Sequence, residues 1–274
     1  MRLDAAASTC LRSALAGPAR PATWLGATPA ALYLRTAGTP GVLALLTHDA
    51  VRLPCALVLP TSSAELPLTS LTGDVLVGDA MIGDNRLAWT GPAGPVIVGV
   101  VREWGPARVR PAPQPRCWAA VGALAALRDA LPAPAVLGID GALLMLLATE
   151  PATGVTALLG RGPGLTPAGD DVLAGFLLGT RAVGLDAAAT RAAVATLAAA
   201  RTTALSAALL WHAARGECID EVAAVLTTLH RDCDLAPALG RLLRVGHTSG
   251  AALATGLSTA ALAALRAKKA GEAA

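Results

Sequence analysis

Short apolar runs follow one another through the first hundred residues. Each run has four to seven residues, several are rich in valine, and Pro, Gly, Ser and Thr separate them. This spacing predicts β-strands joined by tight turns. Gly83-Asp-Asn-Arg86 predicts a hairpin turn, because Gly, Asp and Asn tolerate the backbone angles that such a turn requires. The expected strands cover residues 31–35, 41–46, 55–59, 74–78, 86–89 and 95–101.

The pattern changes after residue 116. Long segments rich in Ala and Leu, both strong helix formers, replace the short valine-rich runs. Their lengths predict an all-α bundle of about seven helices. We expect helices over residues 118–130, 139–150, 167–183, 187–211 (one long helix or two abutting ones), 219–229, 236–245 and 249–268.

A proline-rich segment separates the two patterns. Three prolines between residues 111 and 115 exclude a helix and favour an extended linker. We therefore expect an α+β protein, with a small N-terminal antiparallel β domain, a sheet or barrel of about six strands, followed by a larger all-α helical bundle. The expected boundaries are residues 1–107 for the β domain, 108–116 for the linker and 117–274 for the bundle.

Charge and cysteine content exclude several classes of protein. The net charge is +3, and the charges are scattered without a basic stripe that alternates with aromatic residues. We expect no nucleic-acid partner. The five cysteines form no Cys-x-x-Cys pair, which disfavours a disulfide framework and a zinc site and fits a reducing cytoplasm. The N-terminus is a poor signal peptide and the apolar windows are short or interrupted, so we expect a cytoplasmic protein without a membrane partner.

The turn from Gly160 to Asp171 is the first candidate site. Gly162, Gly164 and Gly169 remove side chains where the backbone turns sharply or a ligand comes close. Thr166 is a favourable N-cap, and the proline after it suits the first position of a helix. A helix that begins here offers free N–H groups to a phosphate or carboxylate.

Asp170 and Asp171 complicate an anion site, because two carboxylates repel an anion. A divalent cation such as Mg²⁺, held by both side chains and a substrate phosphate, would resolve the conflict. Alternatively, one aspartate binds an amino or amide group or acts as a base. In the simplest alternative, both only complement the helix dipole. The segment lacks the Gly-Lys-Ser/Thr ending of a Walker A loop, so nucleotide binding does not follow.

Two further segments are candidate walls of the same site. Val245-Gly-His-Thr-Ser-Gly250 opens a helix with Thr248 or Ser249 as the N-cap, and His247 is a candidate acid–base group or metal ligand. The alternative is a capped helix start with an incidental histidine.

In Arg201-Thr-Thr-Ala-Leu-Ser206, the arginine is a candidate clamp for a carboxylate. Thr202 and Ser206 are expected one turn apart on a shared helix face, and Thr203 lies between them. The alternative is that these hydroxyls bond back to their own helix.

Residues 162–175 read Gly-Pro-Gly-Leu-Thr-Pro-Ala-Gly-Asp-Asp-Val-Leu-Ala-Gly. This resembles the signature of a bacterial family that includes the AllH-type subunit of oxamate carbamoyltransferase. Residues 201–206 and 246–250 are similar to further pieces of that family, so the resemblance is expected to cover nearly the whole chain. Ala168 stands where the family usually has serine, and Ala251 stands where it often has an acidic residue.

The resemblance implies transfer of a carbamoyl group between carbamoyl phosphate and oxamate, which yields oxalurate and phosphate in one direction. It also implies partner subunits, because the family enzyme is built from several different chains. The small anionic substrates would bind at the glycine-bounded helix starts, with Asp170, Asp171 and His247 as catalytic candidates. The other hypotheses are a ligand-binding or assembly subunit without chemistry of its own, and a magnesium-dependent hydrolase or phosphotransferase that uses the aspartate pair.

Overall fold

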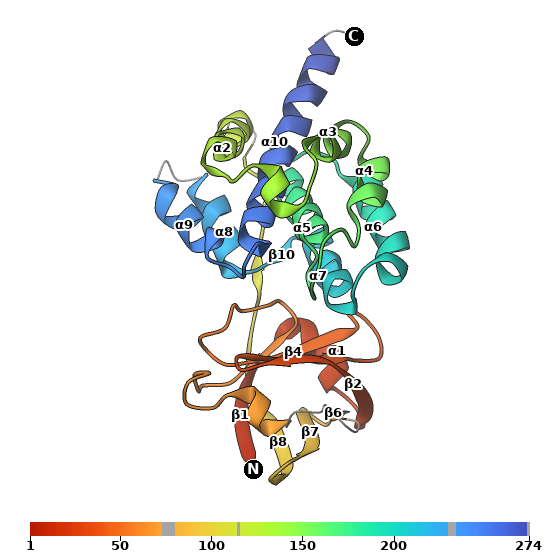
Figure 1. Cartoon of the computed structure of the whole chain (residues 1–274), viewed down its shortest axis with the longest axis vertical. Helices are drawn as coiled ribbons and strands as arrows, with labels where there is room; N and C mark the ends of the chain where they lie inside the picture. Colours follow the sequence, from red (N-terminus) through yellow and green to blue (C-terminus); the bar gives the residue numbers. More distant parts are fainter. Residues whose placement is uncertain (73–79, 114–115, 230–233, 273–274) are drawn as a thin grey trace. The chain divides into compact units, whose positions relative to one another are not determined.

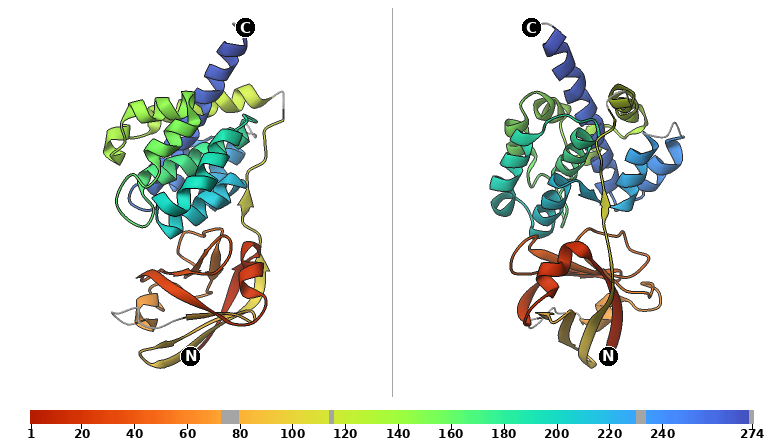
Figure 2. Two further views of the ribbon diagram at one scale, coloured as in Figure 1. Left: turned by 90° about the vertical axis from the view of Figure 1, so that its right-hand side faces the viewer. Right: turned by 180° about the vertical axis from the view of Figure 1, so that it is seen from behind.

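The computed structural model describes residues 1–72, 80–113, 116–229 and 234–272. The chain divides into two compact units, Met1–Pro106 and Ala107–Ala274. Strands make up most of the first unit and helices most of the second (Figures 1 and 2). The strand expected at residues 74–78 lies outside the described residues.

The described part of the first unit contains a closed barrel of eight strands. Around the barrel the strands follow the order β1-β5-β4-β3-β2-β6-β7-β8. Three short helical segments, η1 (Thr9–Leu11), α1 (Arg12–Leu15) and η2 (Leu68–Leu71), connect strands. The strands are β1 (Arg2–Ser8), β2 (Arg20–Thr28), β3 (Ala31–Arg35), β4 (Val42–Leu46), β5 (Ala56–Val58), β6 (Ala80–Gly83), β7 (Arg86–Gly91) and β8 (Gly94–Trp104).

The expectation of an antiparallel β domain is wrong, although the α+β class fits. Two of the pairings, β1 with β8 and β4 with β5, are parallel, so the barrel is mixed. Whether two neighbouring strands are parallel or antiparallel depends on the end of the barrel at which the connecting segment delivers the chain to the next strand. The loop between β4 and β5 carries the chain back to the end where β4 began, and the pairing that closes the barrel joins the first strand to the last.

The hairpin predicted at Gly83-Asp-Asn-Arg86 is confirmed. Gly83 pairs with Arg86, and the two residues between them have positive φ, 50° at Asp84 and 55° at Asn85. Two successive positive φ angles define a type I′ turn, whose twist matches that of the flanking strands.

Leucines fill the barrel core. Leu43 and Leu45 of β4 are fully buried on one face of the strand. Ala44 and Leu46, on the other face, are also buried and pack in a cluster that includes Trp104. Because both faces are covered, β4 is apolar throughout and does not alternate with polar residues.

The second unit contains nine α-helices among the described residues, where about seven were expected. The two extra helices arise from breaks: Pro151 starts a new helix directly after Glu150, and the 187–211 segment divides at Thr202. A short sheet pairs β9 (Ala107–Arg108) with β10 (Glu217–Cys218), and η4 covers Pro134–Leu137. The helices are α2 (Cys117–Ala130), α3 (Gly141–Thr149), α4 (Pro151–Leu158), α5 (Ala168–Ala182), α6 (Ala188–Arg201), α7 (Ala204–Ala214), α8 (Asp220–Thr228), α9 (Ala236–Leu243) and α10 (Ser249–Glu272).

Helices α5 and α10 form the centre of this unit (Figure 1). Every residue of α5 except Arg181 is buried. Glycines allow the two backbones to touch: a Cβ atom at Gly175 would lie 2.1 Å from the Leu253 carbonyl oxygen, and one at Gly256 would lie 2.0 Å from the Val172 oxygen. These contacts fix how the starts of the two helices lie relative to each other.

The segment expected as a linker is bonded to the helical unit over its described first part. Val109 donates its N–H to Gly216 O at 2.8 Å, and Ala112 donates to Ala182 O at 2.8 Å. The side chain of Arg181 donates back to Val109 O at 2.9 Å. Backbone and side chain together hold this extended segment against α5.

By length and composition alone, α10 could cross a membrane. However, 72% of its apolar window is buried inside the protein. This burial is typical of the core helix of a globular unit.

Candidate functional site

The glycines of the 160–171 turn are explained mainly by backbone contacts within the chain. Gly160, Gly162 and Gly164 all have positive φ (73°, 117° and 91°), which other residues rarely adopt. A Cβ atom at Gly160 would meet the Arg201 carbonyl oxygen at 2.2 Å, and one at Gly169 would meet the Leu158 oxygen at 2.1 Å. Gly169 is therefore required for the close packing of this turn on its own chain, whereas Gly164 faces open space.

Thr166 is not the N-cap of α5, contrary to the sequence prediction. Pro167 occupies that position and the helix begins at Ala168. The Thr166 hydroxyl instead lies 3.2 Å from the hydroxyl of Ser249, the first residue of α10. This contact brings the starts of α5 and α10 together.

The first turn of α5 offers fewer free donors than the sequence suggested. Gly169 donates its N–H to Arg161 O at 2.9 Å. Asp170 and Asp171 donate to Pro167 O at 2.9 and 3.2 Å. An anion at a helix start is bound by unpaired N–H groups. Since these three N–H groups already have acceptors, the structure weakens the case for an anion at this helix start.

Asp170 holds the turn together from inside. It is 2% exposed, and its Oδ1 accepts the N–H of Gly160 at 2.8 Å. Its Oδ2 accepts the hydroxyl of Thr202. Burial raises the pKa of this carboxyl, while the bonds from Gly160, Thr202 and Ser206 oppose the rise. Both oxygens are thus engaged within the chain.

We expect Asp170→Ala to destabilise the protein by about 2–4 kcal/mol, because it leaves the Gly160 N–H and the Thr202 hydroxyl buried without an acceptor. Asp170→Asn keeps the shape and one acceptor oxygen, so its cost is expected to be less than half as large. Urea denaturation of the two variants measures the difference. Equal losses would show that Asp170 contributes chiefly through its charge.

Asp171 is placed differently from its neighbour. It is 7% exposed, and its Oδ2 is buried without a hydrogen-bond partner among the described residues. Burial raises the pKa of Asp171 to about 7, the bond with Ser249 opposes the rise, and the charge of Asp170 adds to it. A buried carboxylate oxygen without a partner is costly in a folded protein and indicates a functional contact.

The start of α10 supplies hydroxyls beside Asp171. Ser249 bonds to Asp171 and lies against Thr166. Thr248 precedes the helix, and its carbonyl accepts the N–H of Ala252 at 2.9 Å. His247 is exposed in the turn before it. Its proposed acid–base role stays a prediction.

The 201–206 segment joins the site through a break between helices. Thr202 follows the end of α6 in extended conformation, and Thr203 caps α7 by accepting the N–H of Ser206 at 3.0 Å. The expectation that Thr202 and Ser206 share one helix face is therefore wrong.

Thr203 and Ser206 nevertheless face the first motif. Both hydroxyls donate to Leu165 O, at 2.5 and 3.4 Å. Arg201 is exposed at the end of α6, and its role as a carboxylate clamp stays a prediction. The three sequence segments that were predicted to form one site are thus joined by direct hydrogen bonds.

A magnesium ion fits this donor set poorly. Mg²⁺ requires oxygen ligands in near-octahedral geometry and is usually held by one or two carboxylates. Both oxygens of Asp170 already accept hydrogen bonds from the chain. Among the described residues of the motif, Oδ2 of Asp171 is the one buried carboxylate oxygen without a partner.

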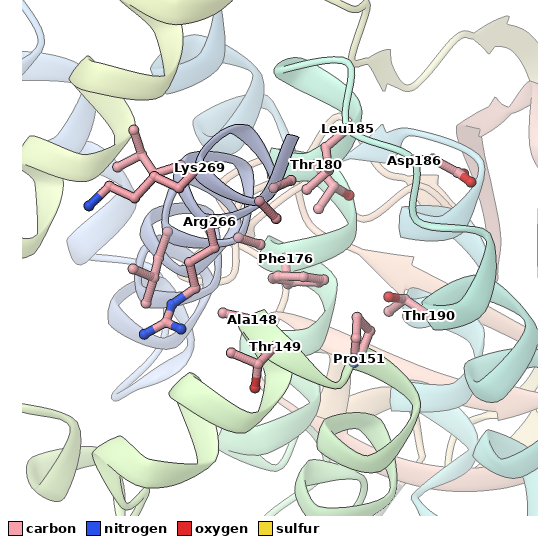
Figure 3. A pocket seen from close by; sticks show the side chains of 15 residues that line it. Ala148, Thr149, Pro151, Phe176, Thr180, Leu185, Asp186, Thr190, Arg266 and Lys269 are labelled. Atoms are coloured by element: carbon pink, nitrogen blue, oxygen red, sulfur yellow. The ribbon is translucent and has the colours of Figure 1, made fainter. Parts of the chain in front are cut away.

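A groove of about 970 Å³ lies elsewhere in the helical unit, along the second half of α5 and the second half of α10 (Figure 3). Phe176 and Thr180 line it from α5, and Arg266 and Lys269 line it from α10. None of the motif residues lines this groove. Its size therefore says nothing about the chemistry of the aspartate pair.

Sequence reasoning missed the difference between the two aspartates and the role of Gly160. Adjacent aspartates in a helix point in directions about 100° apart, so one can face its own turn while the other faces the neighbouring helix. Which of them does so depends on where α10 crosses, and no local pattern encodes that crossing.

Comparison with known proteins supports the resemblance seen in the sequence. A family model described as oxamate carbamoyltransferase subunit AllH matches residues 158–261. The matched segment contains α5, α6, α7, α8, α9 and the first half of α10, and it does not extend over nearly the whole chain as expected. Searches of curated proteins and of solved structures found no match. The region similar to the AllH family is thus the region that builds the candidate site.

Proposed function

We propose that this chain is a subunit of an enzyme of the oxamate carbamoyltransferase type, and that its part is to hold a small carbamoyl compound where α5 and α10 begin. The observation that carries the proposal is the buried, unpartnered Oδ2 of Asp171. It lies within the segment that matches the AllH family model, beside the Ser249 hydroxyl.

The site has the groups that a carbamoyl ligand requires. The free Oδ2 of Asp171 accepts a hydrogen bond from an N–H group, and the hydroxyl oxygens of Thr166 and Ser249 lie beside it. Asp170 accepts hydrogen bonds from the Gly160 N–H and the Thr202 hydroxyl, and these bonds keep the turn in place. Binding groups that are held rigidly lose less entropy when a ligand is fixed.

Partner subunits complete the proposal. In the transfer reaction, a C–O bond of carbamoyl phosphate breaks, an N–C bond to oxamate forms, the attacking nitrogen loses a proton, and phosphate leaves. A leaving phosphate is stabilised by cations. No described ion pair involves Asp170 or Asp171. We infer that another chain contributes most of the cationic half of the site.

Thermal unfolding of the purified chain tests this function. Oxamate, oxalurate or carbamoyl phosphate is expected to raise the melting temperature, because a ligand at a hundred times its Kd stabilises the folded state by about 2.7 kcal/mol. Ser249→Ala should reduce the shift, whereas Ser258→Ala, the same change farther along α10, should leave it intact. The absence of a shift with all three compounds would contradict the proposal. A full shift in Ser249→Ala would place the binding site elsewhere.

A further inference from the structure

The start of α5 carries negative side chains and few free N–H donors, so it is unsuited to binding an anion. Its first-turn N–H groups at residues 169–171 already donate within the chain. Two buried carboxyls follow one another at Asp170 and Asp171, and neither has a cationic partner among the described ion pairs. A phosphate or carboxylate brought here meets like charge without compensating donors.

The same carboxyl groups suit a ligand that donates a hydrogen bond. Asp171 is more than nine-tenths buried, and its Oδ2 is an acceptor without a partner in the described residues. Burial without a partner makes this oxygen a strong acceptor for any N–H group that reaches it. A primary amide supplies such N–H groups, and a carboxylate of the same shape does not.

Two hydroxyls lie beside that acceptor. The Ser249 hydroxyl bonds to Asp171 and is 3.2 Å from the Thr166 hydroxyl. A carboxylate only accepts, so Ser249 donates its single proton to Asp171, and the Thr166 hydroxyl donates to Ser249. With both hydroxyl protons engaged within the chain, the group left for a ligand is the Oδ2 acceptor of Asp171.

We propose that Asp171 is a specificity-determining residue that accepts a hydrogen bond from the amide NH₂ of the carbamoyl ligand, so that the site selects a primary amide over the isosteric carboxylate. This inference rests on the proposed function and identifies which end of the substrate meets α5. The carboxylate or phosphate end of the ligand then points away from the aspartates, toward the cations that another subunit is inferred to supply.

Oxamate and oxalate test the inference directly, because they differ only in the replacement of NH₂ by an oxygen anion. Calorimetric titration of the purified chain at pH 8 is expected to show oxamate bound more tightly than oxalate by roughly tenfold to a hundredfold. Asp171→Asn should lower this ratio to about one or reverse it, since the asparagine NH₂ donates to a carboxylate. Asp220→Asn is the matched control: Asp220 is an exposed aspartate in the first turn of α8, and its variant should keep the wild-type ratio.

The outcomes separate this inference from the proposed function. If Asp171→Asn keeps the wild-type preference for oxamate, the inference is wrong while binding of the carbamoyl compound still stands. If inorganic phosphate raises the melting temperature as much as carbamoyl phosphate does, the phosphate end is bound at the site and the inference is overturned. If wild-type protein binds none of the carbamoyl compounds, the proposed function fails and the inference fails with it.

Discussion

Asp171→Asn is expected to stabilise the protein at pH 8 and to raise its melting temperature by about 5–10 °C. The reason is the environment of this carboxyl: burial raises its pKa from the usual 3.8 to about 7, so an ionised carboxylate at pH 8 is held where the neutral form is favoured. A shift of this size corresponds to at most about 4 kcal/mol, and asparagine avoids this cost because it carries no charge.

The sign of the effect follows from proton linkage. A carboxyl whose pKa is raised by folding binds its proton more tightly in the folded state. The stability that this adds is complete below the unfolded pKa, near 3.8, and is lost as the pH rises through about 7. The difference between Asp171→Asn and wild type should therefore be less than half as large at pH 5 as at pH 8.

Melting curves between pH 5 and 8 measure this difference. Asp220→Asn serves again as the control, because it makes the same substitution at an exposed side chain. A difference between Asp171→Asn and wild type that stays constant over this range would show that the folded-state pKa of Asp171 is not raised. A stabilised variant that has lost its preference for oxamate would show that the buried charge is retained for binding at a cost in stability.

The second large effect concerns the crossing of α5 and α10. Gly256→Ala is expected to destabilise the protein by about 3 kcal/mol or more, because the added Cβ would lie 2.0 Å from the Val172 carbonyl oxygen and 2.7 Å from the Phe176 nitrogen. Both are backbone atoms of a fully packed helix and cannot move aside as a flexible side chain does. The helices must separate, and the starts that carry Asp171 and Ser249 separate with them.

Gly122→Ala is the matched control for this prediction. Gly122 also lies inside a helix, α2, but a Cβ atom there meets nothing within 4 Å. Alanine at an open helical position stabilises by up to about 1 kcal/mol relative to glycine. Chemical denaturation of the two variants should therefore give changes of opposite sign. A loss below about 1 kcal/mol in Gly256→Ala would mean that the close crossing of the two helices contributes little to stability.

Local pattern alone determined much of the secondary structure. The type I′ turn at Asp84 and Asn85 could be predicted because residues that tolerate positive φ are few. The strand at residues 31–35 and the helices near their predicted ranges follow from apolar run length and helix propensity. The strands at residues 2–8 and 20–28 were missed, because the first is rich in alanine and the second contains proline and glycine.

The sequence also identified the segments of the candidate site. Clustered glycines, adjacent aspartates and hydroxyl-rich helix starts are uncommon enough to stand out, and the match to the AllH family model covers all of them. Tertiary structure alone decided what each residue does there. The Thr166 hydroxyl bonds to the Ser249 hydroxyl instead of capping its own helix. Both carboxylate oxygens of Asp170 accept hydrogen bonds from other residues of the chain. Asp171 keeps a free acceptor oxygen because α10 crosses α5 on the side where this residue lies. The crossing is set by backbone contacts between residues some 80 positions apart in the chain. Local sequence does not encode contacts over such a separation.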